Sequence, residues 1–250
     1  MQMTLTALPG IPLIRPGDDL AGLILSSVKE GGIELQPGDV LAVTQKVVSK
    51  AENRYVDLSK VEPTAAAIEL AEDAQKDPRL VEVILSESRE VLRVRPGLII
   101  VEHRLGFICA NAGVDHSNVG GDDTVLLLPE EPERSAAELR KALEGATGAE
   151  IAVLVIDSHG RAWRMGTEGV AIGISGFPAL LDLRGKPDLF EQKLEVTQVG
   201  LADELAAAAS LMMGQSDERR PAVHVRGFPY SLREGSIQEI LRPKELDLFR

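Results

Sequence analysis

The sequence is poor in cysteine, in aromatic residues and in long apolar runs. Its only cysteine is Cys109, so no disulfide can form within the chain, as is usual in a reducing compartment. Aromatic residues make up 3%, so the core must be aliphatic. No apolar run approaches the roughly 20 residues that span a bilayer, and the start lacks the basic segment and long apolar core of a signal peptide. We therefore expect a cytoplasmic protein that makes no use of a membrane.

Several common functional patterns are also absent. The formal net charge of −12 argues against a nucleic-acid partner, which needs a basic face. Four histidines without an H-x-x-x-H pair make a zinc site improbable. Neither G-x-x-x-x-G-K-[ST] nor a G-x-G-x-x-G after a strand occurs, so neither standard phosphate loop would hold a nucleotide. No G-x-S-x-G elbow is present, and Cys109 in its apolar run reads as an inert buried thiol.

What the chain does contain is a mixture of strand and helix patterns without regular alternation. The expected strands are 40–49, two strands within 91–103, 151–157, 169–175 and 222–227. The expected helices are 18–30, 63–76, 77–86, 135 to about 145 or 148, and 198–213. This mixture predicts an α+β or irregular α/β fold. No linker is obvious, so we expect one domain over 1–250, with any subdomain boundary falling within 177–190 or near residue 150.

Two features support particular helix starts. Pro63 suits the first turn of the helix expected at 63–76. Ser135 and Glu138 have the spacing of a capping box, which predicts that the next long helix begins near residue 135. The strand at 151–157 is apolar throughout, which predicts burial on both of its faces.

Oxygen-bearing side chains gather where expected apolar elements end. Asp115 and Asp157 each follow an apolar run and precede a hydroxyl side chain within two positions. Two carboxylates brought together repel each other unless a cation lies between them, and Mg²⁺ or Mn²⁺ would accept such ligands with phosphates completing the shell. The simpler interpretation is that each aspartate serves only as a turn or cap residue. Spacing alone leaves both interpretations open.

Cations and glycines lie near the same strand ends. Lys46 and Lys50 flank one strand end, where they could hold a triphosphate or a carboxylate substrate. Gly113, Gly120 and Gly121 could let backbone N–H groups approach a phosphate. Isolated surface charges and an ordinary glycine turn are the alternatives.

Five stretches, taken together, resemble one known family. They are LPGIPLIRPGDDL at 8–20, VTQKVVSKAE at 43–52, GFICANAGVDHSN at 106–118, VLVIDSHGRAWRMGTEGVAIGISG at 153–176 and LADELAAAASLMMGQSDERRPAVHVRG at 201–227. In this order they resemble the coenzyme F-420-0:γ-L-glutamate ligases of deazaflavin cofactor biosynthesis. The resemblance covers nearly the whole chain, so it is far more specific than any single spacing.

The resemblance implies an activity, cofactors and an assembly. Such enzymes use GTP and two divalent metal ions, Mg²⁺ or Mn²⁺, with K⁺ as a further candidate cation. They join L-glutamate to the lactyl carboxylate of F-420-0 and then add a γ-linked glutamate, by way of an acyl phosphate. The implied fold is an irregular mixed α/β fold in an intertwined homodimer. The flavin-binding nitroreductase domain that is fused to some relatives is not expected here.

The resemblance also assigns roles to residues of this chain. Asp115 and Asp157 correspond to catalytic metal carboxylates, with Ser158 and Gln215 as further metal contacts. The positions that correspond to nucleotide contacts are Leu8, Pro9, Gly10, Ile11, Gln45, Lys46, Lys50, Asn118, Met213, Gly214, Gln215, Ser216, Asp217 and Glu218. The register of the contacts within 44–50 is open by one residue.

Two rival functions remain open at this stage. One is an ATP- or GTP-dependent carboxylate–amine ligase that acts on another acid. The other is a nucleotide-binding regulator without turnover, although such a protein would need fewer metal carboxylates than Asp115 and Asp157 supply. The sequence leaves open the number of glutamates added, the choice of GTP over ATP and of Mg²⁺ over Mn²⁺, and the role of Asp122 and Asp123.

Overall fold

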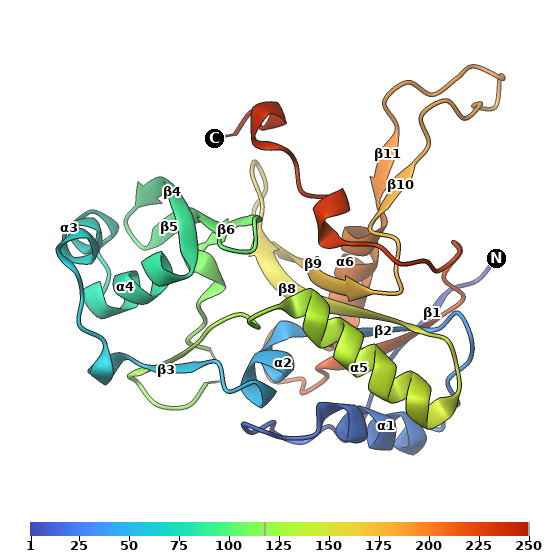
Figure 1. Ribbon diagram of the computed structural model, residues 1–250, viewed down its shortest axis with the longest axis horizontal. Helices are drawn as coiled ribbons and strands as arrows, with labels where there is room; N and C mark the ends of the chain where they lie inside the picture. Colours follow the sequence, from blue (N-terminus) through green and yellow to red (C-terminus); the bar gives the residue numbers. More distant parts are fainter. Residues whose placement is uncertain (118, 250) are drawn as a thin grey trace.

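A five-stranded sheet forms the centre of the protein in the computed structural model, which describes residues 1–117 and 119–249 (Figure 1). The strand order is β1-β12-β2-β8-β9. The strands are β1 (Thr4–Ala7), β12 (Ala222–Arg226), β2 (Val40–Thr44), β8 (Ala152–Gly160) and β9 (Thr167–Ser175). Among the strands that the described residues form in this sheet, only β2 and β8 pair in parallel, and β8 continues beyond the end of β2.

Helices cover both faces of this sheet. One face packs against α1 (Leu20–Glu30), α2 (Gln45–Ala51) and α5 (Pro132–Thr147), and the other against α6 (Leu201–Met213). Side chains alternate along β8, with Val153 and Val155 in the first core and Leu154 and Ile156 in the second. Burial on both faces explains why the strand is apolar without interruption, as the sequence predicts.

Two glycines of β9 allow the helices to approach this sheet closely. A Cβ atom at Gly169 would lie 2.4 Å from the Ala206 carbonyl oxygen of α6. On the opposite side, a Cβ atom at Gly173 would lie 2.5 Å from the Pro132 backbone of α5. Both distances are shorter than a carbon atom tolerates, so any larger residue would push a helix away from the sheet.

The remaining elements form smaller units beside the sheet. They are β3 (Tyr55–Asp57) paired with β7 (Thr124–Leu126), the helices α3 (Ala65–Ala74) and α4 (Pro78–Ser86), the three-stranded sheet β4 (Ser88–Arg95), β5 (Leu98–His103) and β6 (Ile108–Ala110), and the ribbon β10 (Leu180–Asp182) with β11 (Gln198–Gly200). Short 3-10 turns lie at Leu58–Lys60, Asn111–Gly113, Ile237–Glu239 and Lys244–Leu246. Within the described residues, no helix has the length and apolar content to cross a membrane.

This mixed arrangement confirms the predicted α+β class, but several predicted boundaries are wrong. The strand expected at 40–49 ends at Thr44, and a helix begins at once with Gln45. The helix expected at 198–213 begins at Leu201, because residues 198–200 pair as β11. The strand expected to end at Asp157 continues to Gly160, so that aspartate lies within β8.

The two predicted helix starts are also displaced. Thr64, rather than Pro63, adjoins α3 as its N-cap and accepts a hydrogen bond from Ala67 N. The long helix α5 begins at Pro132, so Ser135 lies in its first turn. The Ser135 hydroxyl donates to Glu52 and to the Glu131 carbonyl instead of capping a helix start. Proline at the first position pre-sets the helical φ angle and explains the earlier start.

Candidate active site

An open cavity of about 690 Å³ lies where β2 ends beside the parallel strand β8, which continues past it to Gly160. Thr44 and Ile156, which are paired across the two strands, both line it. The other walls come from the segment 11–14, helix α2, the bend after β6, the end of β8 and the loop after α6. The edge beyond the carboxyl ends of parallel strands is a common place for a ligand site.

Asp115 reaches this cavity by way of a sharp left-handed bend. Asn111 and Ala112 have φ values of 51° and 52°, and Gly113 packs so tightly on Leu128 that a Cβ atom would lie 2.7 Å from its side chain. The small side chains of this stretch therefore serve the turn and its packing. After the bend, Asp115 forms two backbone hydrogen bonds of 2.9 Å with Leu126, which fix its position.

The Asp115 carboxylate is held by a lysine and a serine. Lys46 Nζ lies 2.7 Å from Asp115 Oδ2 and donates to Ser117 Oγ at 2.7 Å. The Ser117 backbone N–H donates to Asp115 Oδ1 at 2.6 Å. Burial alone would raise the pKa of Asp115, but the hydrogen bonds from Lys46 and Ser117 outweigh it and hold the pKa below its ordinary value. Asp115 is therefore ionised at neutral pH.

Helix α2 brings a second lysine to the same wall. Lys46 and Lys50 are separated by four residues on α2, so they share one helix face, and both line the cavity. Burial and the neighbouring Lys46 ammonium group lower the pKa of Lys50, while the charge of Asp115 opposes that shift. Two cations held this close favour an anionic ligand between them.

Asp157 enters the cavity from β8 with a histidine beside it. Asp157 Oδ2 lies 3.0 Å from His159 Nε2, and both side chains are 14% exposed. The His159 ring packs against Phe107, with ring centroids 5.6 Å apart. The strand alternates, so Asp157 and His159 point to the same face of β8, and Ser158 points to the other.

Ser158 instead meets the loop that follows α6. Its hydroxyl donates to Gln215 Oε1 at 2.9 Å, and Gln215 Nε2 donates to Ser210 Oγ at 2.9 Å. Gly214 ends α6 with a φ of 77°, and Glu218 fills the space that a Cβ atom would occupy. The positive φ angle favours a glycine at this turn, whereas the flexible Glu218 side chain could move aside.

Most residues that the sequence analysis singled out line this one cavity. They are Ile11, Lys46, Lys50, Asp115, Asp157, Ser158, Met213, Gly214, Gln215, Ser216, Asp217 and Glu218. Leu8 and Gln45 do not line it because they are buried, the Pro9 carbonyl instead accepts a hydrogen bond from Ser27, and Gly10 packs against Glu30. Of the three glycines considered for a phosphate, Gly113 lines the cavity, and Gly120 and Gly121 do not. Asn118 lies outside the described residues.

The cavity also has lining residues that the sequence analysis passed over. Arg219 and Arg220 follow directly after the predicted loop, and Thr167 adds a hydroxyl group. The adjacent pair of arginines next to a predicted nucleotide loop is the signal that could have extended the prediction by two residues. Their cationic groups add to those of the two lysines.

The oxygen donors of the cavity, which lie on both sides of β8, are of the kinds that suit hard divalent cations. Asp115, Asp157, Ser158 and Gln215 offer carboxylate, hydroxyl and amide oxygens, the ligand types that Mg²⁺ and Mn²⁺ prefer. Over 1–117 and 119–249, no cluster of three or more His, Cys, Asp or Glu side chains could hold a metal by itself. Any such ion would therefore depend on the hydroxyl and amide oxygens and on ligands from a bound phosphate.

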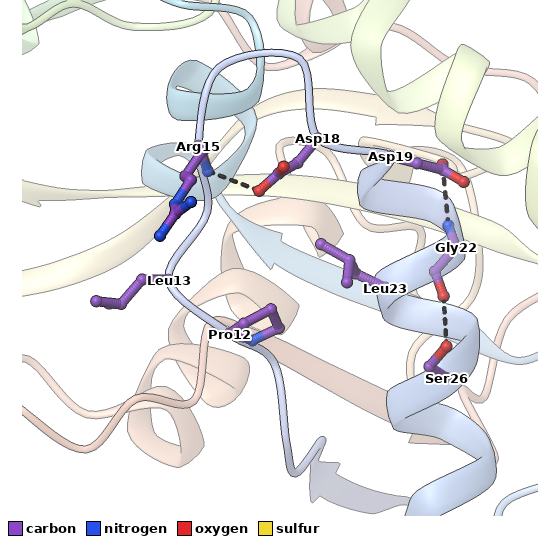
Figure 2. A pocket seen from close by; sticks show the side chains of 8 residues that line it. All are labelled: Pro12, Leu13, Arg15, Asp18, Asp19, Gly22, Leu23 and Ser26. Carbon is purple, nitrogen blue, oxygen red and sulfur yellow. Dashed lines mark hydrogen bonds between the residues drawn. The ribbon is translucent and has the colours of Figure 1, made fainter.

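A second, shallower cavity of about 780 Å³ adjoins the first and shares Pro12 and Leu13 with it. Figure 2 shows it between the N-terminal segment and α1, with Leu23 and Ser26 on the helix side. Asp18 accepts a hydrogen bond from Arg15 N at 2.7 Å, and Asp19 accepts one from Gly22 N at 3.0 Å. Both carboxylates thus stabilise the turn that leads into α1, which makes them poor candidates for ligand binding.

Comparisons with known proteins identify the chain. A family model described as "F420-0:Gamma-glutamyl ligase" matches residues 10–227. A relative from Methanothermobacter thermautotrophicus is 47% identical over the full length of both chains. One from Methanopyrus kandleri is 49% identical over 95% of this chain and 93% of its own. One from Archaeoglobus fulgidus is 42% identical over 100% of this chain and 97% of its own.

All three relatives are named "Coenzyme F420:L-glutamate ligase". These matches define the chain as a ligase. More particularly, it belongs to the F420-0:gamma-glutamyl ligase family.

Proposed function

We propose that the protein is a GTP-dependent ligase of coenzyme F-420 biosynthesis. It joins L-glutamate to F-420-0 by an amide bond and then adds a γ-linked glutamate, through an acyl-phosphate intermediate. The name of the two relatives, "Coenzyme F420:L-glutamate ligase", supports the assignment of an F420 compound and L-glutamate as the substrates. The observation that carries the proposal is one cavity that holds Asp115, Asp157 and two lysines of α2. Free GTP and glutamate as substrates suit a cytoplasmic enzyme.

The cavity walls suggest how the substrates are held. Lys46, Lys50 and the arginines after α6 neutralise the triphosphate, which is what phosphoryl transfer most requires of a protein. Asp115, Asp157, Ser158 and Gln215 would hold two divalent cations. When bound, those cations would shield the negative charge of the phosphates. The acceptor carboxylate then attacks the terminal phosphoryl group of GTP, and GDP leaves. The glutamate amine attacks the resulting acyl phosphate, so that the amide bond forms as phosphate and a proton are released.

The chemistry of the only cysteine agrees with this route. Cys109 is buried, and burial, followed by the charge of Asp157, raises the pKa of its thiol to about 12. A thiol that is protonated at neutral pH is a poor nucleophile. An acyl phosphate needs no covalent link to the protein, so the reaction does not depend on this thiol.

Phosphate release from GTP with Mg²⁺ or Mn²⁺ tests the function. We expect release only when both F-420-0 and L-glutamate are present, and mass spectrometry should show products heavier by one and then two glutamyl groups. Release with a different acid would point to another carboxylate–amine ligase. Nucleotide binding without any release would point to a regulator and contradict the proposal.

We also propose that the protein acts as a homodimer whose partner covers the β10–β11 arm. The arm projects from the body of the molecule (Figure 1). At its tip, Asp188 accepts hydrogen bonds from Phe190 N and Gln192 N, which orders the turn. Leu189 and Phe190 nevertheless remain 97% and 83% exposed. An ordered ribbon that presents large apolar side chains to solvent is typical of an interaction surface.

Changing the tip should therefore separate the subunits. We expect the double substitution Leu189→Ser and Phe190→Ser to shift the protein from dimer to monomer in sedimentation velocity, because it removes the apolar surface at the arm tip. Ile68→Ser, on the exposed side of α3, is the matched control and should stay dimeric. A wild-type monomer, or a dimer that persists in the double variant, would contradict this assignment.

A further inference from the structure

The turn between β8 and β9 forms part of the cavity rim. The two strands pair up to Gly160 and Thr167, and both of these residues line the cavity together with His159. Residues 161–166, of sequence RAWRMG, make the turn that continues beyond them. Whatever part of a substrate extends out of the cavity on this side must pass that turn.

Trp163 occupies the turn in an unusual way. It is the only tryptophan of the chain, and it is 87% exposed. Its backbone φ of 65° lies in the left-handed region, which a bulky residue adopts at an energetic cost. Met165, in the same turn, is 98% exposed as well. A large aromatic side chain held out in solvent at a cavity rim indicates a binding role.

The surroundings of Trp163 suit a planar, negatively charged ligand. The Phe249 ring lies 6.1 Å from the indole ring, tilted by 60°, so one side of the indole is supported by the C-terminal segment. Arg164 is exposed in the same turn. Arg161 lies 3.2 Å from Glu168 and donates to the Gly166 carbonyl, so it shapes the turn. The turn thus combines an aromatic surface with one outward-facing cation.

We propose that Trp163 is the platform on which the planar ring system of the acceptor substrate lies, with Arg164 beside the anionic part of that molecule. This inference rests on the proposed function, in which the acceptor is a deazaflavin with a carboxylate at its far end. That carboxylate must reach Asp115 and Asp157 inside the cavity. Because the ring system is at the other end of the molecule, it would lie at the rim of the cavity. Trp163 follows Asp157 by six residues, so even a fully extended chain would separate their backbones by at most roughly 20 Å, and the turn at 161–166 shortens this distance.

Steady-state kinetics with three variants test the platform. Stacking on an aromatic side chain changes binding by roughly tenfold to hundredfold, so Trp163→Ala should raise the KM for F-420-0 by about that factor. The kcat and the KM values for GTP and L-glutamate should stay near those of the wild type. Trp163→Phe should restore most of the affinity because it keeps a ring. Met165→Ala, in the same turn and equally exposed, is the control and should behave as the wild type.

Fluorescence gives a second readout that needs no turnover. Because Trp163 is the only tryptophan, indole emission reports on this position alone. F-420-0 should quench it without GTP or metal, and L-glutamate should not. Product formation by the wild type with an unchanged KM in Trp163→Ala would overturn the platform but leave the proposed function intact. Loss of dimer in Trp163→Ala with an unchanged KM would assign the turn to self-association and also overturn the platform. Absence of ligation in the wild type would instead reject the proposed function.

Discussion

Replacing Asp157 by Asn should lower the turnover number for ligation by about a thousandfold or more while leaving the fold intact. The substitution keeps the shape of the side chain but removes the negative charge that would hold a divalent cation beside the phosphates. Loss of one preorganised electrostatic contact in an active site costs about a hundredfold to a thousandfold, and loss of a metal ligand should exceed that. Asp157 lies at the open end of β8, beyond the double-sided core, so the free energy of unfolding should change little.

Three measurements separate this effect from unfolding. Phosphate release gives the turnover number, electron paramagnetic resonance gives the affinity for Mn²⁺, and circular dichroism gives the Tm. We expect the first two to fall and the Tm to remain within a few degrees. Asp73→Asn, on the exposed side of α3, is the matched control and should change none of them. Near-normal turnover in Asp157→Asn would show that this carboxylate does not hold a cation.

Four strands of the central sheet could be predicted because their apolar runs must be buried, whereas β1 (Thr4–Ala7) and the strand order were not predicted. The apolar runs of β2 and β8 are continuous, and each strand contributes alternate side chains to two separate cores. The change from strand β2 to helix α2 at Gln45 could not be predicted from the pattern of apolar and polar residues. Helix α2 spans Gln45–Ala51, and seven residues are too few for a helical period to stand out after an apolar strand. Yet that short helix places Lys46 and Lys50 on the cavity wall.

The meeting of Asp115 with the other cavity residues depends on structure that no local spacing encodes. Asp115 is positioned by a left-handed bend at Asn111 and Ala112 and by its pairing with Leu126. Propensity argues against positive φ at an alanine, so the bend is imposed by the surrounding packing. The polar residues that follow Ile156 suggested a loop. In the structure, residues 157–160 instead remain in β8 and pair with β9. Family resemblance, which compares whole chains, retains such information.

Replacing Glu87 by Ala should lower the free energy of unfolding by about 3 to 5 kcal/mol. Glu87 is buried, and its carboxylate lies 2.9 Å from Arg104 Nε, 3.1 Å from Arg54 Nη2 and 3.5 Å from His103 Nε2. Removing Glu87 takes the buried carboxylate away from Arg54 and Arg104, which then pair with the largely exposed carboxylate of Glu130. Loss of one member of a buried ionic network costs more than the network contributes. Arg54 also donates to the Leu128 carbonyl, so the network joins α4 and β5 to the end of β7. Glu69→Ala, on exposed α3, is the control and should change little.

The same network predicts how stability depends on pH. Burial alone would raise the pKa of Glu87, but the nearby His103 ring, the hydrogen bond and charge of Arg104 and the charge of Arg54 lower it from 4.5 to about 2. Because the pKa is lower in the folded state, the stabilisation is fully present above about pH 5. It is lost as the pH falls from there towards 2. Urea unfolding of the wild type at about pH 7 and about pH 3 should show this loss. In Glu87→Ala the difference between the two pH values should shrink by roughly 1 to 3 kcal/mol. An undiminished difference would mean that other carboxylates, such as Asp39 with His224 and Arg226, account for the acid sensitivity.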